Sequence, residues 1–506
     1  MALAHYNKLK TIKPEENEFD IKIAECYFNI PYYTNAINKC NEIIDNLGID
    51  NKCFPNIIFI KIKSLIKLKK INEAKDVFDA YKNTIEKMND SKNEITEIVN
   101  EINNKIKNLE GQYNFKEIFK LKDSFDINIG EYVNKKLEIK NTKDKGLGIF
   151  TKEKIKIGEL IVVSKAFSAC PPNDNDKNNN SSLYMKYDNP DKDESEKINF
   201  PLVFKEKNKL EDILSYKLSN YPDDYSDILY LFNSNNKYIN YEERKKDKNI
   251  DLKKIEKILK YNTIKVDYYY EPISKGLWFY PSFFNHSCIP NCIYFGFGDI
   301  LIIIAVNEID KNSELFINYY SVDALYDERQ TYIQDNYNFK CKCELCEYEG
   351  KKIKENKENK ILNEYLTRLR NNFLKNDKGQ NEFMKINNEV ISQKEIKQMV
   401  KFLEQNKKMF SCYEKNIMYL NCAHCMMKYD PYQSYEYLES ALKYTENRNY
   451  YFEKLTLYSL SIFAKILKSQ ARKEFVSKKF RAFFEKYFAD QQEFVNLLLK
   501  EYNIIS

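Results

Sequence analysis

Apolar residues in the first 118 positions recur at the three- and four-residue spacing of amphipathic helices, which places them on one face. The clearest run, with 3-4-4-3 spacing, consists of Ile95, Ile98, Ile102, Ile106 and Leu109. Two earlier segments, residues 24–47 and 56–83, show a similar pattern, and each is long enough for a pair of helices. The pattern therefore predicts a helical domain over residues 1–118.

The two paired segments share a small residue at the point where their helices must approach closely. This residue is Ala36 in the first segment and Ala74 in the second, 38 positions later. Tetratricopeptide repeats have a period of about 34 residues, and a longer loop around residues 50–54 accounts for the difference. We expect tetratricopeptide-like repeats, with a generic array of helical hairpins as the alternative.

From residue 136 the pattern changes to short apolar runs that are typical of strands. Strands are predicted at four places: residues 137–139, 159–163, 300–306 and 315–320. Residues 171–199 are rich in Asn, Asp, Lys and Ser, so we expect a disordered loop there. Residues 202–265 are expected to form a mostly helical insertion.

The last third of the chain, residues 351–506, is again predicted to be helical, after a charged linker at residues 351–360. A late amphipathic helix has an aromatic stripe that we interpret as a core face, made of Val476, Phe480, Phe483, Phe484, Tyr487 and Phe488. The sequence thus predicts an α+β protein with three domains, at residues 1–118, 119–350 and 351–506.

Composition narrows the class of protein. The 506 residues carry 81 basic and 75 acidic side chains, a net charge of +6. This near balance does not favour nucleic acid as a direct ligand. No signal-peptide pattern and no run of about 18 apolar residues is present, so we expect an intracellular protein, nuclear or cytoplasmic, without membrane association. Twelve cysteines in a chain of this length favour clustered metal ligands over a disulfide framework.

Three cysteines, Cys341, Cys343 and Cys346, lie within six residues in the pattern C-x-C-x2-C. Zinc prefers four ligands in a tetrahedron, so one more is needed, and Cys288 and Cys292 are both candidates. Four thiolates would leave no open position for a substrate, so we predict a structural zinc site.

A second group contains Cys412, Cys422, His424 and Cys425. Its spacing is not that of a standard zinc site and fits one face of a helix. We therefore predict that these residues pack in a hydrophobic core.

Several other residues are candidates for a ligand-binding or catalytic site, but none of them predicts such a site by itself. Asn285 and His286 are polar residues that follow two phenylalanines, and such side chains need hydrogen-bond partners if they are buried. The glycines of Gly146-Leu147-Gly148 allow a backbone turn to approach a ligand closely. Tyr319 ends a predicted strand, and Tyr337 precedes the cysteine cluster.

Taken in order, these motifs resemble those of the SET-domain lysine methyltransferases. The matching order is G-x-G at residue 146, N-H-S-C-x-P-N at residue 285, E-L-x3-Y at residue 314, and C-x-C-x2-C at residue 341. The match covers about residues 136–350 and looks closest to the SET and MYND group and to tetratricopeptide-repeat SET proteins, although no MYND zinc finger is recognisable. The resemblance implies a β-rich SET domain with a knot-like core, followed by a post-SET zinc site and flanked by the two helical regions.

The resemblance also implies a reaction and a set of site residues. S-adenosylmethionine would be the methyl donor and a lysine of a protein, histone or non-histone, the acceptor. The implied donor-binding residues are Lys145, Gly146, Leu147, Asn285, His286, Tyr337 and Phe339. Tyr319 and Tyr337 would lie at the methyl-transfer centre, and Tyr337 would also close the lysine channel. Zinc would be held by Cys288, Cys341, Cys343 and Cys346.

The sequence departs from the family at two places. Leu147 stands where relatives often have arginine, and Ser313-Glu314 reduces the usual run of two acids to one. The alternative to an enzyme is therefore a degenerate SET scaffold. In either case, the helical repeats are expected to bind partner proteins.

Overall fold

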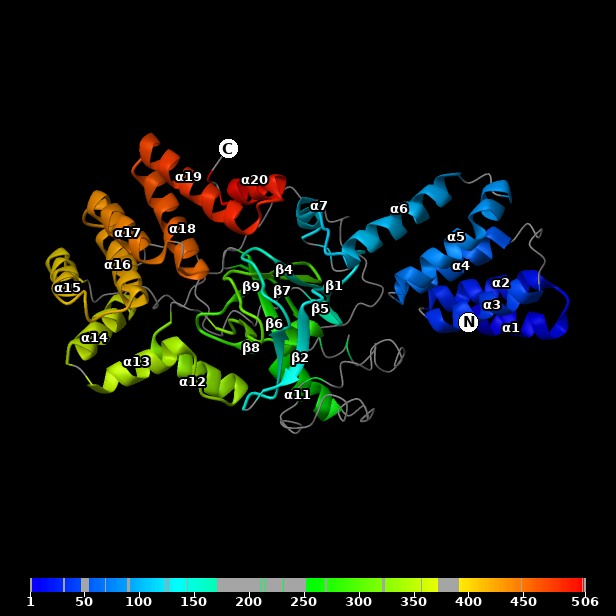
Figure 1. The fold of residues 1–506 in the computed structure, drawn as a ribbon, viewed down its shortest axis with the longest axis horizontal. Coiled ribbons are helices and arrows are strands. Elements are labelled where there is room, and N and C mark those ends of the chain that lie inside the picture. Colours follow the sequence, from blue (N-terminus) through cyan, green and yellow to red (C-terminus); the bar gives the residue numbers. More distant parts are fainter. Residues whose placement is uncertain are drawn as a thin grey trace.

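The chain has a helical N-terminal lobe, a central region with three small β-sheets and a helical C-terminal region on the opposite side (Figure 1). This computed structural model describes residues 2–30, 32–46, 54–68, 70–88, 92–122, 124, 127–142, 144–170, 210, 214, 231, 252–268, 271–320, 324–355, 357–371, 391–446, 448–502 and 504. The loop predicted at residues 171–199 and most of the insertion predicted at 202–265 lie outside these residues. The described end of the insertion contains α11 (Leu252–Asn262), after which the chain enters a strand at Thr263.

Six helices form the N-terminal lobe: α1 (Ala2–Ile12), α2 (Asn17–Asn29), α3 (Tyr33–Asn46), α4 (Phe54–Lys67), α5 (Ile71–Met88) and α6 (Lys92–Leu109). Ala36 on α3 and Ala74 on α5 are completely buried, as expected for close helix approach. The predicted stripe on α6 is buried at Ile98 and Ile102 but ends before Leu109, which is exposed. The two predicted helix pairs are confirmed, and their tetratricopeptide character stays a prediction.

The described residues of the central region form three sheets. The first has the order β1-β4-β10-β9, with β1 (Tyr132–Val133), β4 (Leu160–Lys165), β10 (Ile300–Ala305) and β9 (Cys292–Phe297). The second has the order β2-β3-β11-β8, with β2 (Leu137–Asn141), β3 (Leu147–Thr151), β11 (Glu314–Ile317) and β8 (Asn285–His286). The third has the order β5-β7-β6, with β5 (Ser168–Cys170), β7 (Glu271–Leu277) and β6 (Thr263–Tyr268).

All four predicted strands are present, as β2, β4, β10 and β11. Strand β10 is buried at every position because β4 and β9 flank it and both of its faces are covered, which suits a continuous run of isoleucine and leucine. Strands β1, β5, β6, β7, β8 and β9 were not predicted. Strands β1, β5 and β8 have three residues or fewer, β6 begins at the end of the predicted insertion, and β7 contains a proline and has no regular alternation of apolar residues.

The C-terminal region contains nine described helices, namely α12 (Tyr326–Tyr337), α13 (Glu344–Glu355), α14 (Lys357–Asn371), α15 (Gln393–Gln405), α16 (Cys412–Met426), α17 (Pro431–Thr445), α18 (Tyr450–Ile466), α19 (Gln470–Tyr487) and α20 (Gln492–Glu501). The prediction of a charged linker at residues 351–360 is wrong, because all of its described residues belong to α13 or α14. Lys and Glu are good helix formers, so their abundance does not by itself interrupt a helix.

Helices α14 to α20 share one hydrophobic core with the first sheet. Phe494 on α20 lies against Phe115 of the short helix α7 (Phe115–Lys120), with ring centroids 5.6 Å apart, and against Phe295 of β9 at 6.3 Å. Lys116 forms an ion pair with Glu493 at 3.0 Å beside this contact. The predicted aromatic stripe of α19 is buried in the same core, so the last helices are fixed against the sheet.

Two cysteines of the second group lie in this core, as predicted, whereas Cys412 is only partly buried and its Sγ accepts a hydrogen bond from Arg448 at 2.7 Å. Cys422 and Cys425 are buried on α16, and the imidazole Nε2 of His424 lies 3.2 Å from Ser459 Oγ on α18. These residues do not gather into a metal-binding group in the described part of the chain.

Burial of His424 predicts acid sensitivity. Burial lowers the pKa of His424 from 6.5 to about 4, so the unfolded chain binds a proton below pH 6.5 that the folded chain does not bind until about pH 4. The contribution of His424 to the free energy of unfolding is therefore fully present above pH 6.5. It falls by about 1–3 kcal/mol as the pH is lowered toward 4. Between pH 6.5 and pH 4, the melting temperature of His424→Gln should fall less than that of the wild-type protein. The matched control is the same substitution at His5, which is exposed on α1.

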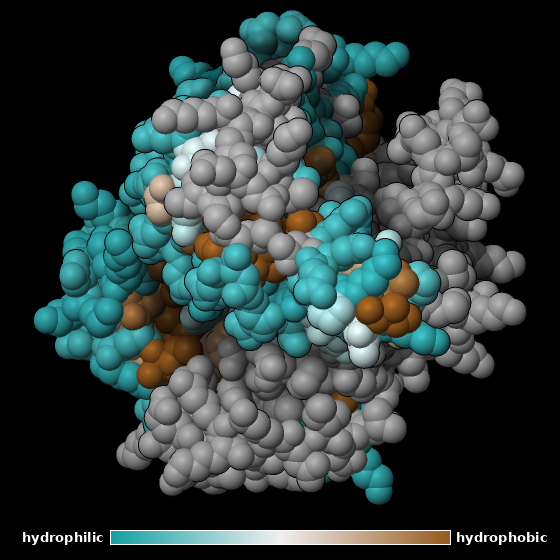
Figure 2. Space-filling model, turned by 90° about the vertical axis from the view of Figure 1, so that its right-hand side faces the viewer, coloured by the Kyte–Doolittle hydropathy of each residue, from teal (hydrophilic) through white to brown (hydrophobic). Residues whose placement is uncertain are grey.

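Within the described residues, no helix combines the length and the apolar character needed to cross a membrane. Seen from the end formed by the N-terminal lobe, the described surface is mostly hydrophilic and has smaller hydrophobic areas (Figure 2).

Candidate methyl-transfer and metal site

The second sheet brings together motifs that are far apart in the sequence. Strand β11 pairs with β3 on one side, where Leu315 lies opposite Ile149, and with β8 on the other. The pairing of β8 with β11 is parallel, so Asn285 lies opposite Phe316 and His286 lies opposite Ile317. The Gly-x-Gly, Asn-His and Glu-Leu motifs therefore meet on three adjacent strands.

The glycine motif is a tight turn at the start of β3. Gly146 has a φ of 79°, in the left-handed region that glycine adopts without strain. Its carbonyl accepts hydrogen bonds from the backbone N–H of Thr142 at 2.6 Å and from the Thr142 hydroxyl at 2.8 Å. The Leu147 side chain packs in the core, and its carbonyl accepts a hydrogen bond from Asn285 Nδ2 at 3.1 Å. Leu147 can therefore contribute to a ligand site through its backbone.

Glu314 connects the two predicted donor-binding motifs. One carboxylate oxygen accepts a hydrogen bond from Asn285 Nδ2 at 2.7 Å, and the other accepts from Lys145 Nζ at 2.7 Å. The Lys145 ammonium also lies 4.6 Å from the centroid of the Phe316 ring. The single acid left in the shortened Ser313-Glu314 run thus holds both the glycine turn and the Asn-His strand.

Asn291 was not predicted as a site residue, yet it fixes the same strand. Its Nδ2 donates to the carbonyl of Glu314 at 2.9 Å, and its Oδ1 accepts from the backbone N–H of Phe316 at 2.8 Å. The available signal was its place as the last residue of the N-H-S-C-x-P-N motif. Thr142 had no comparable signal, because its role depends on a turn that sequence alone does not position.

Two tyrosines lie side by side at the end of this sheet. The rings of Tyr319 and Tyr337 are 4.8 Å apart, and the Tyr319 hydroxyl donates to the carbonyl of Phe284 at 2.5 Å. Burial raises the pKa of both phenols well above the usual value. Both hydroxyls are therefore neutral at physiological pH and can act as hydrogen-bond donors.

His286 is buried between this aromatic pair and the cysteines. Its Nδ1 accepts a hydrogen bond from the backbone N–H of Tyr319 at 3.1 Å, and its Nε2 lies 3.4 Å from Cys288 Sγ. Phe339 completes the group, with its ring 6.4 Å from that of His286 and 6.5 Å from that of Tyr337. All the residues predicted for the donor and transfer sites thus belong to one connected cluster.

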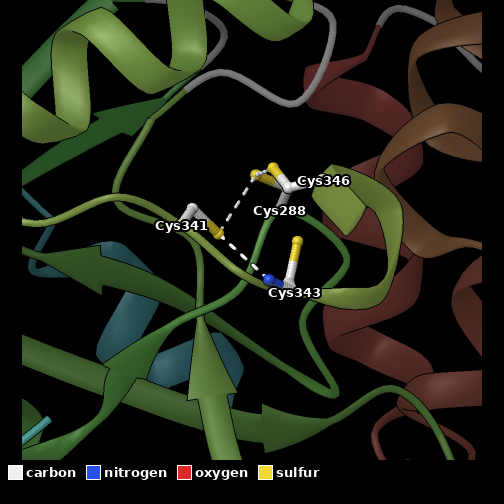
Figure 3. Close-up of side chains that lie close together, drawn as sticks. All are labelled: Cys288, Cys341, Cys343 and Cys346. Carbon is white, nitrogen blue, oxygen red and sulfur yellow. Dashed lines mark hydrogen bonds between the residues drawn. The ribbon is translucent and has the colours of Figure 1, made fainter. Parts of the chain in front are cut away.

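The four cysteines implied as metal ligands also come together. The sulfur atoms of Cys288, Cys341, Cys343 and Cys346 all lie within 4.8 Å of one another and point toward a common centre (Figure 3). Cys292, the other candidate for the fourth ligand, is buried in a separate core on β9.

The chemistry of this sulfur group fits a cation. Contact with Cys341 and then with the other two sulfurs raises the pKa of Cys288, whereas the contact with Cys288 lowers the pKa of Cys343 to about 6. Protons are therefore shared within the group, and four thiolates this close need a positive charge to coexist. Four sulfur donors match the ligand set of structural zinc.

Helix α12 holds the cysteine segment in place through two side chains. Gln330 donates to the carbonyl of Cys341 at 3.0 Å and accepts from the N–H of Cys341 at 3.1 Å. Arg329 is 2% exposed and donates to the carbonyl of Ala324 and to the carboxylate of Glu349. A buried cation beside the thiolates offsets their negative charge, and no motif in the sequence indicated this role.

The C-terminus of α12 directs the chain from one site to the other. Tyr337 is the last residue of the helix, and Asn338 follows with a φ of 60°. Asparagine tolerates this left-handed conformation better than most residues. The turn places Phe339 beside His286 and leads the chain into the cysteine cluster.

The family model of the SET domain matches residues 146–320, from the glycine turn to just beyond Tyr319. The chain therefore contains a SET domain, as the order of its motifs predicted. Among relatives, the histone-lysine N-methyltransferase ASHR2 of Arabidopsis thaliana is 32% identical over 97 residues, which cover 18% of this chain and 24% of that protein. The histone-lysine N-methyltransferase SMYD3 of Mus musculus is 38% identical over 78 residues, which cover 15% and 18% of the two chains.

A SET and MYND domain-containing protein of Dictyostelium discoideum is 41% identical over 76 residues, which cover 15% of this chain and 14% of that relative. The chain thus matches a quarter or less of the length of each of these three relatives. Each of these three matches covers less than a fifth of this chain.

Proposed function

We propose that this protein transfers a methyl group from S-adenosylmethionine to a lysine side chain of a protein substrate. The observation that carries the proposal is the meeting of four features at one sheet of a SET domain. The glycine turn and Asn285 lie on strands that flank β11, Tyr319 lies just beyond the end of β11, and Tyr337 of α12 packs against Tyr319. Two of the relatives are named histone-lysine N-methyltransferases, so a histone is the first substrate to test.

The donor would lie along the glycine turn and the Asn285 strand. The donor, when bound, supplies an activated methyl group on a sulfonium. Lys145, Gly146 and the Leu147 backbone would follow its methionine end, while Phe339 would lie near its adenine. Glu314 keeps the turn and the strand at a fixed separation, which serves the alignment of reacting groups.

Tyr319 and Tyr337 would position the target lysine. Lysine has an ordinary pKa of about 10.4 and must be neutral to act as a nucleophile. Two half-buried aromatic rings disfavour the ammonium form by excluding water. The Tyr319 hydroxyl, held by the Phe284 carbonyl, can then orient the amine. None of these residues is assigned as a general base.

Zn²⁺ would be held by Cys288, Cys341, Cys343 and Cys346 as a structural ion. Cys288 follows the Asn-His strand, and the other three cysteines follow Phe339. The ion would therefore join the two segments that contribute to the donor site. The two helical regions would contact the protein substrate on either side of the SET domain.

The direct test is calorimetric titration of S-adenosylmethionine into zinc-loaded protein, followed by a methyl-transfer assay with radiolabelled donor and a histone mixture. Micromolar donor binding that is lost in Asn285→Ala, together with labelled lysine, would support the proposal. Absence of donor binding to the folded protein would contradict it and would favour the degenerate scaffold.

Gly148 provides a test of the close contact between the two donor-binding motifs. A Cβ at this position would lie 2.8 Å from Glu314 Oε1 and 2.9 Å from Asn285 Nδ2. Gly148→Ala should displace the hydrogen bond between them and weaken donor binding about tenfold or more, as measured by calorimetry. The melting temperature and zinc content should stay close to wild type. Unchanged donor affinity would show that this contact does not shape the donor site.

A further inference from the structure

We infer that the imidazole of His286 is a positioning group that links the cysteine cluster to Tyr319 and does not itself contact the methyl donor. The inference rests on the proposed function for the role of Tyr319 and on the cysteine cluster as a metal site. It differs from the role that the family resemblance implies for this side chain.

Both ring nitrogens of His286 have partners inside the protein. Nδ1 accepts the backbone N–H of Tyr319, so it carries no proton. In the neutral ring the proton is then on Nε2, which lies 3.4 Å from Cys288 Sγ. An N–H···S hydrogen bond is stronger when the accepting sulfur is a metal-bound thiolate than when it is a neutral thiol, as in the outer shell of many metal sites. The metal would thus fix both the tautomer and the orientation of the ring.

The other end of this link is Tyr319. Its backbone N–H is held by His286, and its hydroxyl is held by the Phe284 carbonyl. The backbone N–H of Ser287 also donates to the carbonyl of Ile317 at 3.1 Å, which continues the parallel pairing. Tyr319 is therefore restrained at its backbone and at its hydroxyl. A shift of the His286 imidazole would move the backbone of Tyr319.

Asn285 has the complementary task. The Asn285 side chain is only partly buried, and its amide bonds the glycine turn and Glu314. His286, in contrast, is 7% exposed and faces the tyrosines and the cysteines. Successive side chains on a strand point to opposite faces. Asn285 and His286 therefore face two different sites, although they are neighbours on β8. Asn285 serves the donor side, and His286 serves the metal and Tyr319 side.

Two conservative variants separate the two contacts of the imidazole. The amide of asparagine reaches the position of Nδ1, so His286→Asn can keep the contact with Tyr319 and lose that with Cys288. The amide of glutamine reaches the position of Nε2, so His286→Gln can keep the contact with Cys288 and lose that with Tyr319. His286→Ala loses both contacts, and Asn285→Ala is the control for the donor side.

The experiment measures zinc release to a chromogenic chelator, donor affinity by calorimetry, and kcat in the full-length protein. We expect His286→Asn to release zinc about 10- to 100-fold faster than wild type and to retain most of its kcat when zinc is in excess. His286→Gln should hold zinc nearly as wild type does and lose most of its kcat. Both variants should bind S-adenosylmethionine within about threefold of wild type, whereas Asn285→Ala should bind it far more weakly with normal zinc release.

Two results would overturn the inference. One is a loss of donor affinity in His286→Asn and His286→Gln as large as that in Asn285→Ala. The other is zinc release at the wild-type rate in both His286→Asn and His286→Ala. If wild type itself binds no donor, the proposed function fails, and the zinc-release comparison still decides whether His286 supports the metal site.

Discussion

Replacing Tyr319 by phenylalanine is expected to lower the rate of methyl transfer by about 100-fold or more while leaving donor affinity within about threefold. The hydroxyl donates to the Phe284 carbonyl at 2.5 Å beside the ring of Tyr337. Its removal frees that carbonyl and takes away a neutral donor held at a fixed position. The donor-binding contacts of Asn285 and the glycine turn do not involve this hydroxyl, so binding of S-adenosylmethionine should persist.

Initial rates with radiolabelled donor and donor titrations by calorimetry would separate the two effects. A matched control is Tyr435→Phe, which removes the hydroxyl of a buried tyrosine in the C-terminal helices. This control should transfer methyl groups at the wild-type rate. Full turnover in Tyr319→Phe would remove Tyr319 from the transfer centre and leave the fold assignment untouched.

The second large effect is expected from Cys288→Ser. Serine is a poor zinc ligand, and loss of one of four ligands opens a site whose binding energy contributes directly to folding. Zinc content should fall from about one ion per chain toward zero, and the melting temperature should fall by roughly 10 °C or more. Donor binding should be lost as well, because the ion would join the Asn-His strand to the segment that carries Phe339.

Cys292→Ala is the appropriate comparison, since Cys292 is equally buried and lies only four positions away. This variant should keep its zinc, as measured by atomic absorption, and lose only the modest stability expected from a smaller core side chain. A normal zinc content in Cys288→Ser, or its loss in Cys292→Ala, would contradict the assignment of the fourth ligand.

The sequence was most informative where chemistry and spacing are local. The C-x-C-x2-C segment and the Asn-His motif could be recognised as candidate site residues from the sequence alone. The isoleucine-rich run at residues 300–306 correctly predicted β10. The choice between Cys288 and Cys292 could not be made from spacing, because it depends on which sulfur the fold turns toward the other three. In the structure the Cys288 sulfur lies with the other three, whereas Cys292 belongs to the core beneath β9.

Residues that act through long-range contacts were missed for the same physical reason. Arg329 and Gln330 lie in no motif, and the contacts that connect them to the cysteine segment and to Glu349 span 11 to 20 positions. Asn291 ends the N-H-S-C-x-P-N motif, but its contacts with β11 span 23 to 25 positions. The aromatic contact between α7, β9 and α20 joins three distant segments, none of which stands out alone. Hydrophobic periodicity shows that a face is buried, but it does not show which other face covers it.

Helix α12 has a consequence for the way this region can change during evolution. Gln330, near the start of α12, forms hydrogen bonds with the backbone of Cys341. Tyr337, at the end of α12, packs against Tyr319. An α-helix turns by about 100° and rises about 1.5 Å for each residue. Substitutions on the exposed side of α12 leave this relation intact, whereas insertion or deletion of one residue would swing Tyr337 away from its partner. The length of this helix is therefore a tighter constraint than its sequence. The number of residues between Gln330 and Tyr337 fixes the orientation of the transfer centre relative to the cysteine cluster, so we expect substitutions in α12 to be tolerated more often than insertions or deletions.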